Sequence, residues 1–323
     1  MTLSDTTATT AARTRAATES GIPGRRRNRI FGDEGTLTHP SSHGFLLVLP
    51  AAIFVCVFVL APLVFALYIS LTNWPLIGSY KFIGLDNYAT IGEDPAFWQA
   101  VGYTLTYTAI VTLPILGLGY LMAVVVRANR PGSTLIRTLF FLPYVIGLST
   151  LSFLMVLEAQ PNSGAVNLLL KSLGITDGTT AWLVDGPLAT GLICALIIWA
   201  VSGSTMVLLL SGMQAIPREV YESAEVDGSS WISREWHITI PMLRRPIAMS
   251  LILSVIGSFL AFSQFFIMTG GGPGRATTPI VLYIYQRAFV QLQVGAATAA
   301  SVILIIVVAA ISAVQFWLLR EED

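Results

Sequence analysis

Residues 219–246 read EVYESAEVDGSSWISREWHITIPMLRRP, a polar and acidic stretch that separates two long apolar segments. Pro217, just before it, suits the first turn of a helix, where its missing N–H is harmless. Gly228 suits the position just past a helix end, where a left-handed cap favours glycine. Glu222 and Glu225 are three residues apart and share one face. The stretch therefore predicts a short capped helix of about three turns, with an ordinary polar connecting loop as the alternative.

A second short helix is expected directly after the first. Ser229 or Ser230 can cap it, and it would run from Trp231 to Thr239. Pro241 and Pro246 are expected to end it before the next apolar segment begins.

The composition is that of a membrane protein. Of the 323 residues 54% are hydrophobic and 11% charged, with a mean hydropathy of +0.72, whereas soluble domains carry about 25% charged residues. The formal net charge of zero gives no sign of a nucleic-acid partner. Cys56 and Cys194 both lie in apolar runs and are expected to pack there rather than to pair. The three histidines are scattered, so no metal site is expected.

Six apolar runs are long enough to cross a membrane, for which about 20 residues are needed. They are roughly Gly44–Leu71, Phe97–Val126, Leu135–Leu157, Leu188–Leu210, Ile247–Met268 and Val294–Leu319. The predicted fold class is therefore an all-α membrane protein with six transmembrane helices and a cytoplasmic helix between the fourth and the fifth.

Arginine and lysine in short loops set the orientation of such a chain. With the N-terminus in the cytoplasm, fourteen of the 18 Lys and Arg residues fall inside and the other four outside. This predicts a multi-pass protein of the inner (plasma) membrane with both termini in the cytoplasm. The domains follow: a disordered tail over 1–43, a permease domain over 44–319 that contains the cytoplasmic loop 211–246, and a cytoplasmic end over 320–323. A short surface helix is expected around 165–170.

The loop resembles the "EAA" loop of ABC importer permeases. The resemblance rests on Glu222-Ser223-Ala224, on Asp227-Gly228 and on Ile238-Thr239-Ile240-Pro241, and Ser223 replaces the usual alanine. By this resemblance Glu222, Ser223, Ala224, Asp227, Gly228 and Pro241 would form the coupling site for an ATPase subunit.

Other segments resemble the carbohydrate branch of these permeases, which is dependent on a binding protein and includes maltose, glycerol-phosphate and lactose permeases. They are Phe82-Ile83-Gly84-Leu85-Asp86-Asn87-Tyr88, Phe140-Phe141-Leu142-Pro143 and Thr269-Gly270-Gly271-Gly272-Pro273. The sequence departs from the family at Leu157-Glu158-Ala159-Gln160, where a tryptophan-rich stretch is common.

The resemblance implies a transmembrane subunit of an ATP-driven importer that moves a sugar or sugar-like solute inward by alternating access. Its protein partners would be a second homologous permease, two cytoplasmic ATPase subunits and an extracytoplasmic solute-binding protein. It would also contact the sugar substrate and membrane lipid. The chain lacks the Gly-x-x-x-x-Gly-Lys-Ser/Thr motif. It is therefore not expected to be an enzyme or to hold a cofactor, and ATP with Mg²⁺ would be bound by the partner ATPases.

An ion-gradient-driven secondary transporter is the alternative function. Such proteins usually carry Asp, Glu or Lys within their spans, and this chain has none in the middle of a predicted span. A channel would not need the capped helix pair.

Polar side chains within spans are candidates for a substrate path. Trp199 offers an aromatic face for a sugar ring, and the amide of Gln264 can bond to hydroxyl groups. Ser263 and Ser149 are further candidates, although small polar residues also bind helices to one another in membranes.

The predicted topology can be tested by labelling single cysteines in intact cells stripped of outer barriers. Cysteines that replace Asn87, Asp177 or Ala276 should react with an impermeant thiol reagent, because the charge bias places these loops outside. A cysteine that replaces Ser230 should not react. The unchanged chain is the control, because it shows how much reagent binds to the native Cys56 and Cys194. Reaction at position 230 from outside would contradict the orientation.

Overall fold

The structure is a computed structural model that describes residues 41–75, 78–128 and 131–320. The tail predicted over 1–43 therefore falls outside the described residues, apart from residues 41–43, and so do residues 321–323. The chain divides into two units at the Leu60–Ala61 bond. The first unit contributes helix α1 (Ser41–Val55) and a π-helical turn, η1 (Cys56–Leu60), and the second contributes all later elements.

Within the described ranges, four helical runs are long and apolar enough to cross a membrane. They are Leu47–Ser70, α4 (Pro95–Arg127), α8 (Gly186–Gln214) and Val294–Trp317 of α15 (Val294–Arg320). These correspond to the first, second, fourth and sixth predicted spans. The run Leu47–Ser70 passes from the first unit into α2 (Ala61–Ser70) of the second. Two sharply bent helix pairs bring the number of possible spans to six. The part of the chain that the structure describes contains only isolated β-bridges, so the all-helical fold class is confirmed.

The third predicted span is not one straight helix. It consists of α5 (Ser133–Ile146) and α6 (Leu148–Glu158), whose axes differ by 92°. Gly147 separates them with a φ of 89°, a left-handed conformation that glycine adopts without steric cost. The continuous apolar sequence hid this break.

The fifth predicted span is also interrupted. Helix α12 (Arg244–Phe259) ends before Leu260–Phe262, and the short α13 (Ser263–Met268) follows. The expected surface helix is present as α7 (Ala165–Ser172). The loops contain further short helices that were not predicted, namely α3 (Asp86–Glu93), α14 (Ile280–Tyr285) and the π-helical turn η3 (Gln286–Val290).

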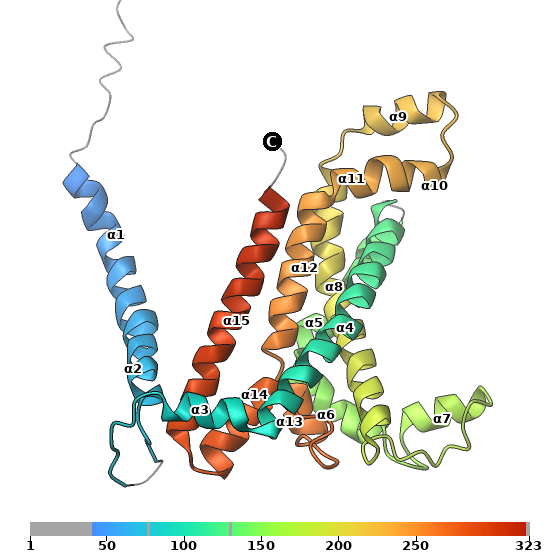
Figure 1. Cartoon of the computed structure of the whole chain (residues 1–323). Coiled ribbons are helices and arrows are strands. Elements are labelled where there is room, and N and C mark those ends of the chain that lie inside the picture. Colours follow the sequence, from blue (N-terminus) through green and yellow to red (C-terminus); the bar gives the residue numbers. More distant parts are fainter. Residues whose placement is uncertain (1–40, 76–77, 129–130, 321–323) are drawn as a thin grey trace, which may run out of the picture. The chain divides into compact units, whose positions relative to one another are not determined.

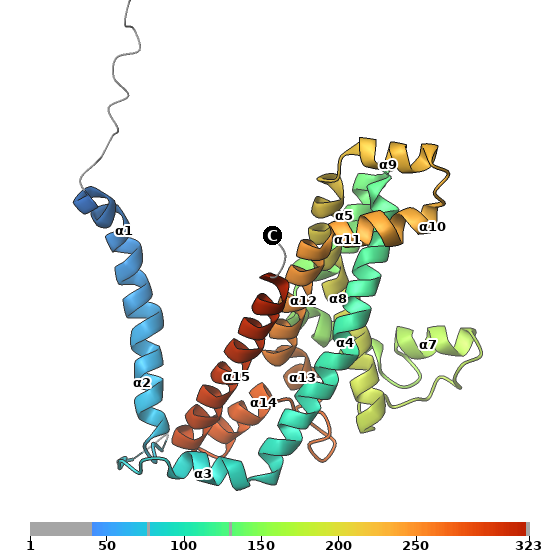
Figure 2. The same cartoon turned by 45° about the horizontal axis from the view of Figure 1, so that its top comes forward.

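Figures 1 and 2 show how the second unit is arranged. Helices α4, α8 and α12 run side by side. A pair of short helices, α9 (Arg218–Val226) and α10 (Trp231–Arg234), projects beyond one end of these helices. Helices α3, α7, α13 and α14 lie at the opposite end. The loop between the fourth and fifth spans is therefore separated from α3, α7, α13 and α14 by the length of the long helices, and it lies at the same end as the turn from α4 to α5.

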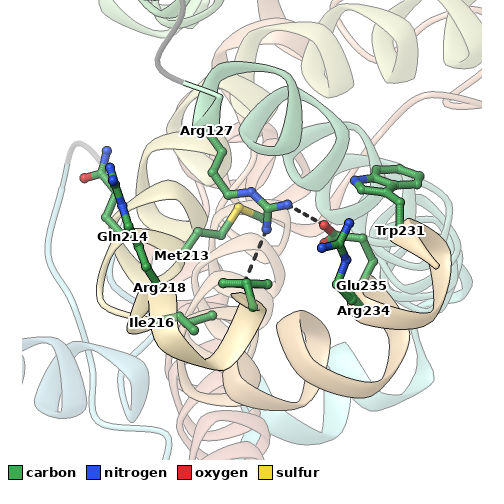
Figure 3. Close-up of a pocket in the computed structure, with 9 residues that line it drawn as sticks. Arg127, Met213, Gln214, Ile216, Arg218, Trp231, Arg234 and Glu235 are labelled. Atoms are coloured by element: carbon green, nitrogen blue, oxygen red, sulfur yellow. Dashed lines mark hydrogen bonds and ion pairs between the residues drawn. The ribbon is translucent and has the colours of Figure 1, made fainter. Parts of the chain in front are cut away.

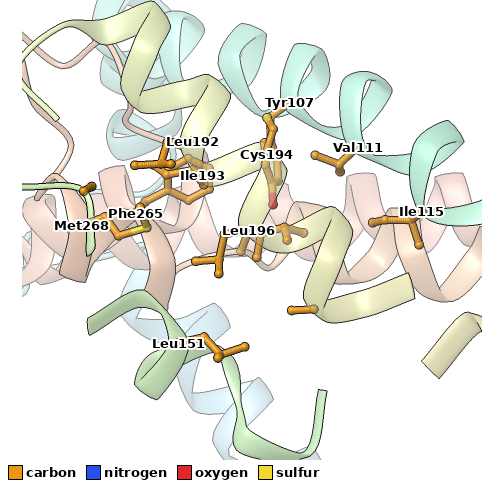
Figure 4. Packing of buried hydrophobic residues seen from close by; sticks show 14 of the residues in the cluster. Tyr107, Val111, Ile115, Leu151, Leu192, Ile193, Cys194, Leu196, Phe265 and Met268 are labelled. Carbon is orange, nitrogen blue, oxygen red and sulfur yellow. The ribbon is translucent and has the colours of Figure 1, made fainter. Parts of the chain in front are cut away.

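Helix α8 is the centre of the packing. Its apolar window is 61% buried, against 33% for α4 and 33% for Val294–Trp317. In the largest cluster, Tyr107 of α4 and Phe265 of α13 meet edge to face with ring centroids 5.0 Å apart (Figure 4). Cys194 is buried in this cluster as expected, whereas Cys56 is exposed.

Asp94 joins the start of α4 to the α14 segment. Its carboxylate accepts hydrogen bonds from the backbone of Ala96 at 2.9 Å and from the Tyr283 hydroxyl at 2.7 Å, and it lies 3.5 Å from the Arg287 guanidinium. Burial alone would raise the pKa of Asp94. The hydrogen bonds, together with Arg287 and Arg275, outweigh burial and hold that pKa below its usual value. The carboxylate therefore stays ionised while it caps α4.

Gly203 allows α8 to approach α5 closely. A Cβ atom at Gly203 would overlap the carbonyl oxygen of Phe140, which belongs to the α5 backbone. A backbone atom cannot move aside as a flexible side chain can, so α5 would have to shift. Gly191 lies on the same helix, and nothing is within 4 Å of the Cβ position there.

We expect Gly203→Ala to lower the thermal stability of the purified protein, by about 1–3 kcal/mol as for an overpacked core. Gly191→Ala should leave stability equal or slightly higher, because alanine favours a helix. Thermal unfolding of both variants in the same detergent measures the difference. A Gly203→Ala protein as stable as Gly191→Ala would contradict the close α5–α8 contact.

Candidate functional site

The first candidate site is the loop that projects beyond α8. Pro217 is the cap residue of α9, one position before the predicted first turn. Gly228 follows the helix with a φ of +78°, and nothing lies within 4 Å of its Cβ position. The glycine is therefore required by the backbone conformation and not by a crowded neighbour.

Helix α9 has no buried residue. Glu222, Ser223 and Asp227 are exposed, Ala224 is half-buried, and Val226 is 88% exposed. A single exposed apolar side chain is common on protein surfaces, so the accessibility of the whole helix, and not Val226 alone, marks α9 as a candidate docking element. The structure thus presents the predicted coupling residues of α9 on one accessible helix.

The second helix of the loop begins as predicted at Trp231. The Ser230 hydroxyl accepts a hydrogen bond from the backbone of Ser233 at 3.3 Å, so Ser230 is the cap. Helix α10 continues into a π-helical turn, η2 (Glu235–Thr239), as far as the predicted end of the helix.

The expectation that Pro241 and Pro246 end this helix is wrong. Pro241 lies within a further short helix, α11 (Ile240–Met242), where it is exposed. In the π-helical turn, the Ile240 N–H bonds to the Glu235 carbonyl, five residues earlier. The pattern of backbone hydrogen bonds therefore changes just before Pro241, which has no N–H to donate. The bend of 70° comes at Leu243, and Pro246 lies in the first turn of α12, a position that tolerates proline.

A polar network fixes η2 to the end of α4. The Glu235 carboxylate is buried and accepts hydrogen bonds from Arg127 Nη2 at 2.5 Å and from the Tyr120 hydroxyl at 2.6 Å. Arg127 Nη1 also lies 3.4 Å from the Tyr221 hydroxyl of α9 and 3.5 Å from Thr239 Oγ1. One guanidinium therefore contacts both helices of the loop.

A hollow of about 400 Å³ lies beside this network (Figure 3). Its lining comes from the ends of α4 and α8 and from both loop helices, and consists of Arg127, Met213, Gln214, Ile216, Arg218, Tyr221, Trp231, Arg234 and Glu235. Helix α9 is thus separated from α10 by open space rather than by packed side chains. The Arg234–Glu225 ion pair, 3.1 Å long, bridges the two helices at the surface.

The second candidate site is a cavity of about 350 Å³ among the long helices. Helices α4, α5, α6, α8, α12 and α13 supply its walls, which are formed by Tyr107, Ile115, Tyr144, Leu148, Ile197, Val201, Ser204, Thr205, Leu208, Ser250, Leu253, Ser254, Gly257, Ser258 and Gln264. Both helix breaks border it. Tyr144 and Leu148 flank Gly147, and Ser258 and Gln264 flank the break at Leu260–Phe262. Irregular backbone at membrane depth is tolerated where it lines such a cavity.

The cavity wall carries hydrogen-bonding groups with spare capacity. Gln264 is 2% exposed, and its amide donates to the Tyr107 hydroxyl at 3.5 Å. The hydroxyls of Ser250 and Ser254 are buried and have no hydrogen-bond partner among the residues that the structure describes. An unpartnered buried polar atom costs free energy, so a hydroxyl-rich occupant would be favoured here.

Of the predicted substrate-path residues, the structure brings only Gln264 to this cavity wall. Trp199 is 48% exposed on α8, Ser149 is exposed on α6, and Ser263 is half-buried on α13, and none of the three lines the cavity. Their predicted role in a substrate path stays a prediction.

Several residues of both sites were not selected from the sequence. Ser250 and Ser254 are four residues apart and share one face of α12 with Ser258, a spacing that was visible in the sequence. Glu235 was also visible, as a carboxylate next to a tryptophan. Its partner Arg127 lies 108 residues earlier, and no local pattern connects the two.

The fold combines helices that are long and apolar enough to cross a membrane, a cavity among them and an exposed two-helix loop, as in a membrane transport protein. Residues 115–321 match the model of the family "Binding-protein-dependent transport system inner membrane component". The chain belongs to this family and is a permease subunit of an import system. This membership gives no support to the ion-gradient-driven alternative.

Relatives match nearly the whole length of the chain. The probable ABC transporter permease protein YurN of Bacillus subtilis is 32% identical over 84% of this chain and 94% of its own. The sulfoquinovosyl glycerol transport system permease protein SmoG of Agrobacterium fabrum is 32% identical over 86% of this chain and 90% of its own. The multiple sugar-binding transport system permease protein MsmF of Streptococcus mutans is 31% identical over 87% of this chain and 96% of its own.

A solved structure shares the fold. A chain of a bacterial ABC transporter for the import of the acidic polysaccharide alginate superposes with a TM-score of 0.77 at 22% identity, and the match covers 87% of this chain and 96% of that one. The predicted family and fold are thus confirmed.

Proposed function

We propose that this chain is one of two permease subunits of an ATP-driven importer that moves a sugar or sugar-like polyol into the cell. Its cavity would open alternately to the two sides of the membrane. Both termini would lie in the cytoplasm, as the distribution of Lys and Arg indicates.

The observation that carries this proposal is the exposed helix α9. It projects beyond the end of the long helices, buries none of its residues and carries Glu222 beside the nearly bare Val226. A cytoplasmic ATPase subunit of matching shape would cover this helix. ATP and Mg²⁺ would be bound by two such subunits, and closure of the ATPase pair would displace α9 as a rigid body.

Two further partners follow from the family. A solute-binding protein would deliver the substrate to the outer loops, and a second homologous permease would complete the translocation path.

The proposed substrate class is supported by the cavity chemistry. Serine and tyrosine hydroxyls and the Gln264 amide can bond to sugar hydroxyls, while Tyr107 and Tyr144 offer rings to the C–H faces of the sugar. The names of two relatives refer to sulfoquinovosyl glycerol and to multiple sugars, which are ligands of this chemical class.

Coupling through α9 can be tested with Gly228→Val and Glu222→Lys. The valine strains the left-handed position and places a branched side chain on the docking surface, and the lysine reverses a charge there. We expect uptake to be lost and co-purification of the ATPase to be weakened, while membrane insertion stays normal. Uptake, pull-down of the ATPase and membrane abundance are measured together.

Gly174→Val is the matched control for this experiment. Gly174 has a φ of +71° with open space at its Cβ position, as Gly228 has, but it follows α7 at the opposite end of the molecule. Its variant should therefore leave co-purification of the ATPase unchanged. Full transport by both Gly228→Val and Glu222→Lys would exclude α9 as the coupling helix.

The substrate cavity can be tested with Gln264→Leu, which removes the amide at similar volume. If Gln264 binds substrate, uptake per folded complex should fall while stability in detergent holds or rises. If the amide only joins helices, stability should fall by roughly 1 kcal/mol and uptake only in proportion to abundance. Gln315→Leu, the same change on α15 away from the cavity, is the control. Unchanged uptake per folded complex in Gln264→Leu would remove Gln264 from the substrate path.

A further inference from the structure

A buried carboxylate holds the loop helices against the last two turns of α4. Glu235 is 5% exposed, and each of its carboxylate oxygens has a partner on α4: Oε1 contacts Arg127 and Oε2 accepts from Tyr120. The two partners are seven residues apart and therefore lie on one face of the helix. Glu235 thus joins η2 to α4 at two points along the α4 axis. Two contacts fix the orientation of η2 relative to α4 as well as the distance between them.

The same guanidinium extends the network to α9. The hydroxyls of Tyr221 and Thr239 are 3.0 Å apart, and both lie within reach of Arg127 Nη1. The Arg127 guanidinium also lies over the Tyr221 ring, 5.4 Å from its centroid, an arrangement that attracts a cation to an aromatic face. Tyr221 directly precedes Glu222 on the exposed helix.

Apart from the three-residue connection to α8, in which Ile216 is buried, helix α9 makes few contacts with the long helices. It buries none of its own residues, and the hollow of about 400 Å³ separates its start from α10. Its ion pair with α10, Glu225–Arg234, has a carboxylate that is 72% exposed, and exposed pairs of this kind hold weakly. A displacement of α9 therefore reaches α4 through the guanidinium contacts.

Helix α4 leads from this network to the cavity. Tyr107, whose hydroxyl accepts from Gln264, lies about 20 residues before Arg127, which is roughly 30 Å along a continuous helix. A helix with one end held by the loop and the other in the cavity wall can couple the two sites, although Pro114 lies between them and removes one hydrogen bond of the helix.

We infer that Tyr120, Arg127, Tyr221, Glu235 and Thr239 form a mechanical linkage that transmits the displacement of α9 to α4 and so to the cavity. These are positioning residues, because none of them touches substrate or nucleotide. The linkage rests on the proposed function of α9 as the ATPase-docking helix. It adds the path by which movement of that helix reaches the substrate.

The test uses the complete transporter, with all its subunits, in proteoliposomes. Arg127→Lys keeps the charge but loses the planar fork that contacts three side chains at once, and Tyr221→Phe removes one hydroxyl. We expect each variant to bind the ATPase and hydrolyse ATP, and to import about 2- to 30-fold less solute per ATP, the range typical of residues that couple two sites. Arg137→Lys, the same change at an exposed arginine of α5, should leave the ratio unchanged.

Combining Glu235→Gln with Arg127→Lys shows whether the two residues act as one linkage or through independent contacts. If Arg127 and Glu235 act as one unit, the double variant Arg127→Lys/Glu235→Gln should import no less solute per ATP than the more affected single variant. Fully additive losses would mean that the two residues act separately and would overturn the linkage.

Two other outcomes would also overturn it. One is a normal ratio of solute to ATP in Arg127→Lys and Tyr221→Phe. The other is a loss of uptake and ATP hydrolysis in equal proportion, with less assembled complex, because that is the result of a purely structural role. If Glu222→Lys and Gly228→Val abolish coupling while Arg127→Lys does not, the linkage fails and the docking helix stands. If Arg127→Lys alters the ratio while Glu222→Lys and Gly228→Val do not, the docking helix fails, and the linkage as stated fails with it.

Discussion

Hydrocarbon offers no hydrogen-bond partner to a peptide group, so a chain that crosses it must satisfy its backbone internally. The long helices α4, α8 and α15 meet this requirement along most of their length, and Pro114 within α4 removes a single hydrogen bond. The two places that depart from it, Gly147 and Leu260–Phe262, both border the cavity among the helices. The same constraint that makes the fold helical therefore confines irregular backbone to the region where the protein itself, and a polar occupant, can replace water.

The polar groups of the chain divide between two depths with different physics. At the loop end, Glu235 is buried at a cost that is offset because both of its oxygens have charged or hydroxyl partners. In the cavity, the hydroxyls of Ser250 and Ser254 have no hydrogen-bond partner within the described part of the chain. The first arrangement is complete within the chain and holds two elements together. The second is incomplete, and a ligand with hydroxyl groups would complete it.

The sequence was sufficient for the helices but not for their breaks. Long apolar runs predict spans because of their length, and α4 and α8 extend only a few residues beyond the predicted limits. Gly147 and Leu260–Phe262 are as apolar as their surroundings, so hydropathy could not locate them. The predicted helix end at Pro241 was wrong because the rule that proline ends a helix takes no account of the π-helical turn before it. Gln264 was selected from the sequence because burying an amide in lipid without a hydrogen-bond partner costs free energy. The pairing of Arg127 with Glu235 was not predictable, because only the tertiary fold brings these two residues together.

The exposure of α9 has a consequence for the life of the subunit before assembly. A helix with no buried residue, ended by a glycine and followed by two serines, is a segment that proteases can unfold locally and cut. A copy without its partner would display this segment, and an assembled copy would hide it.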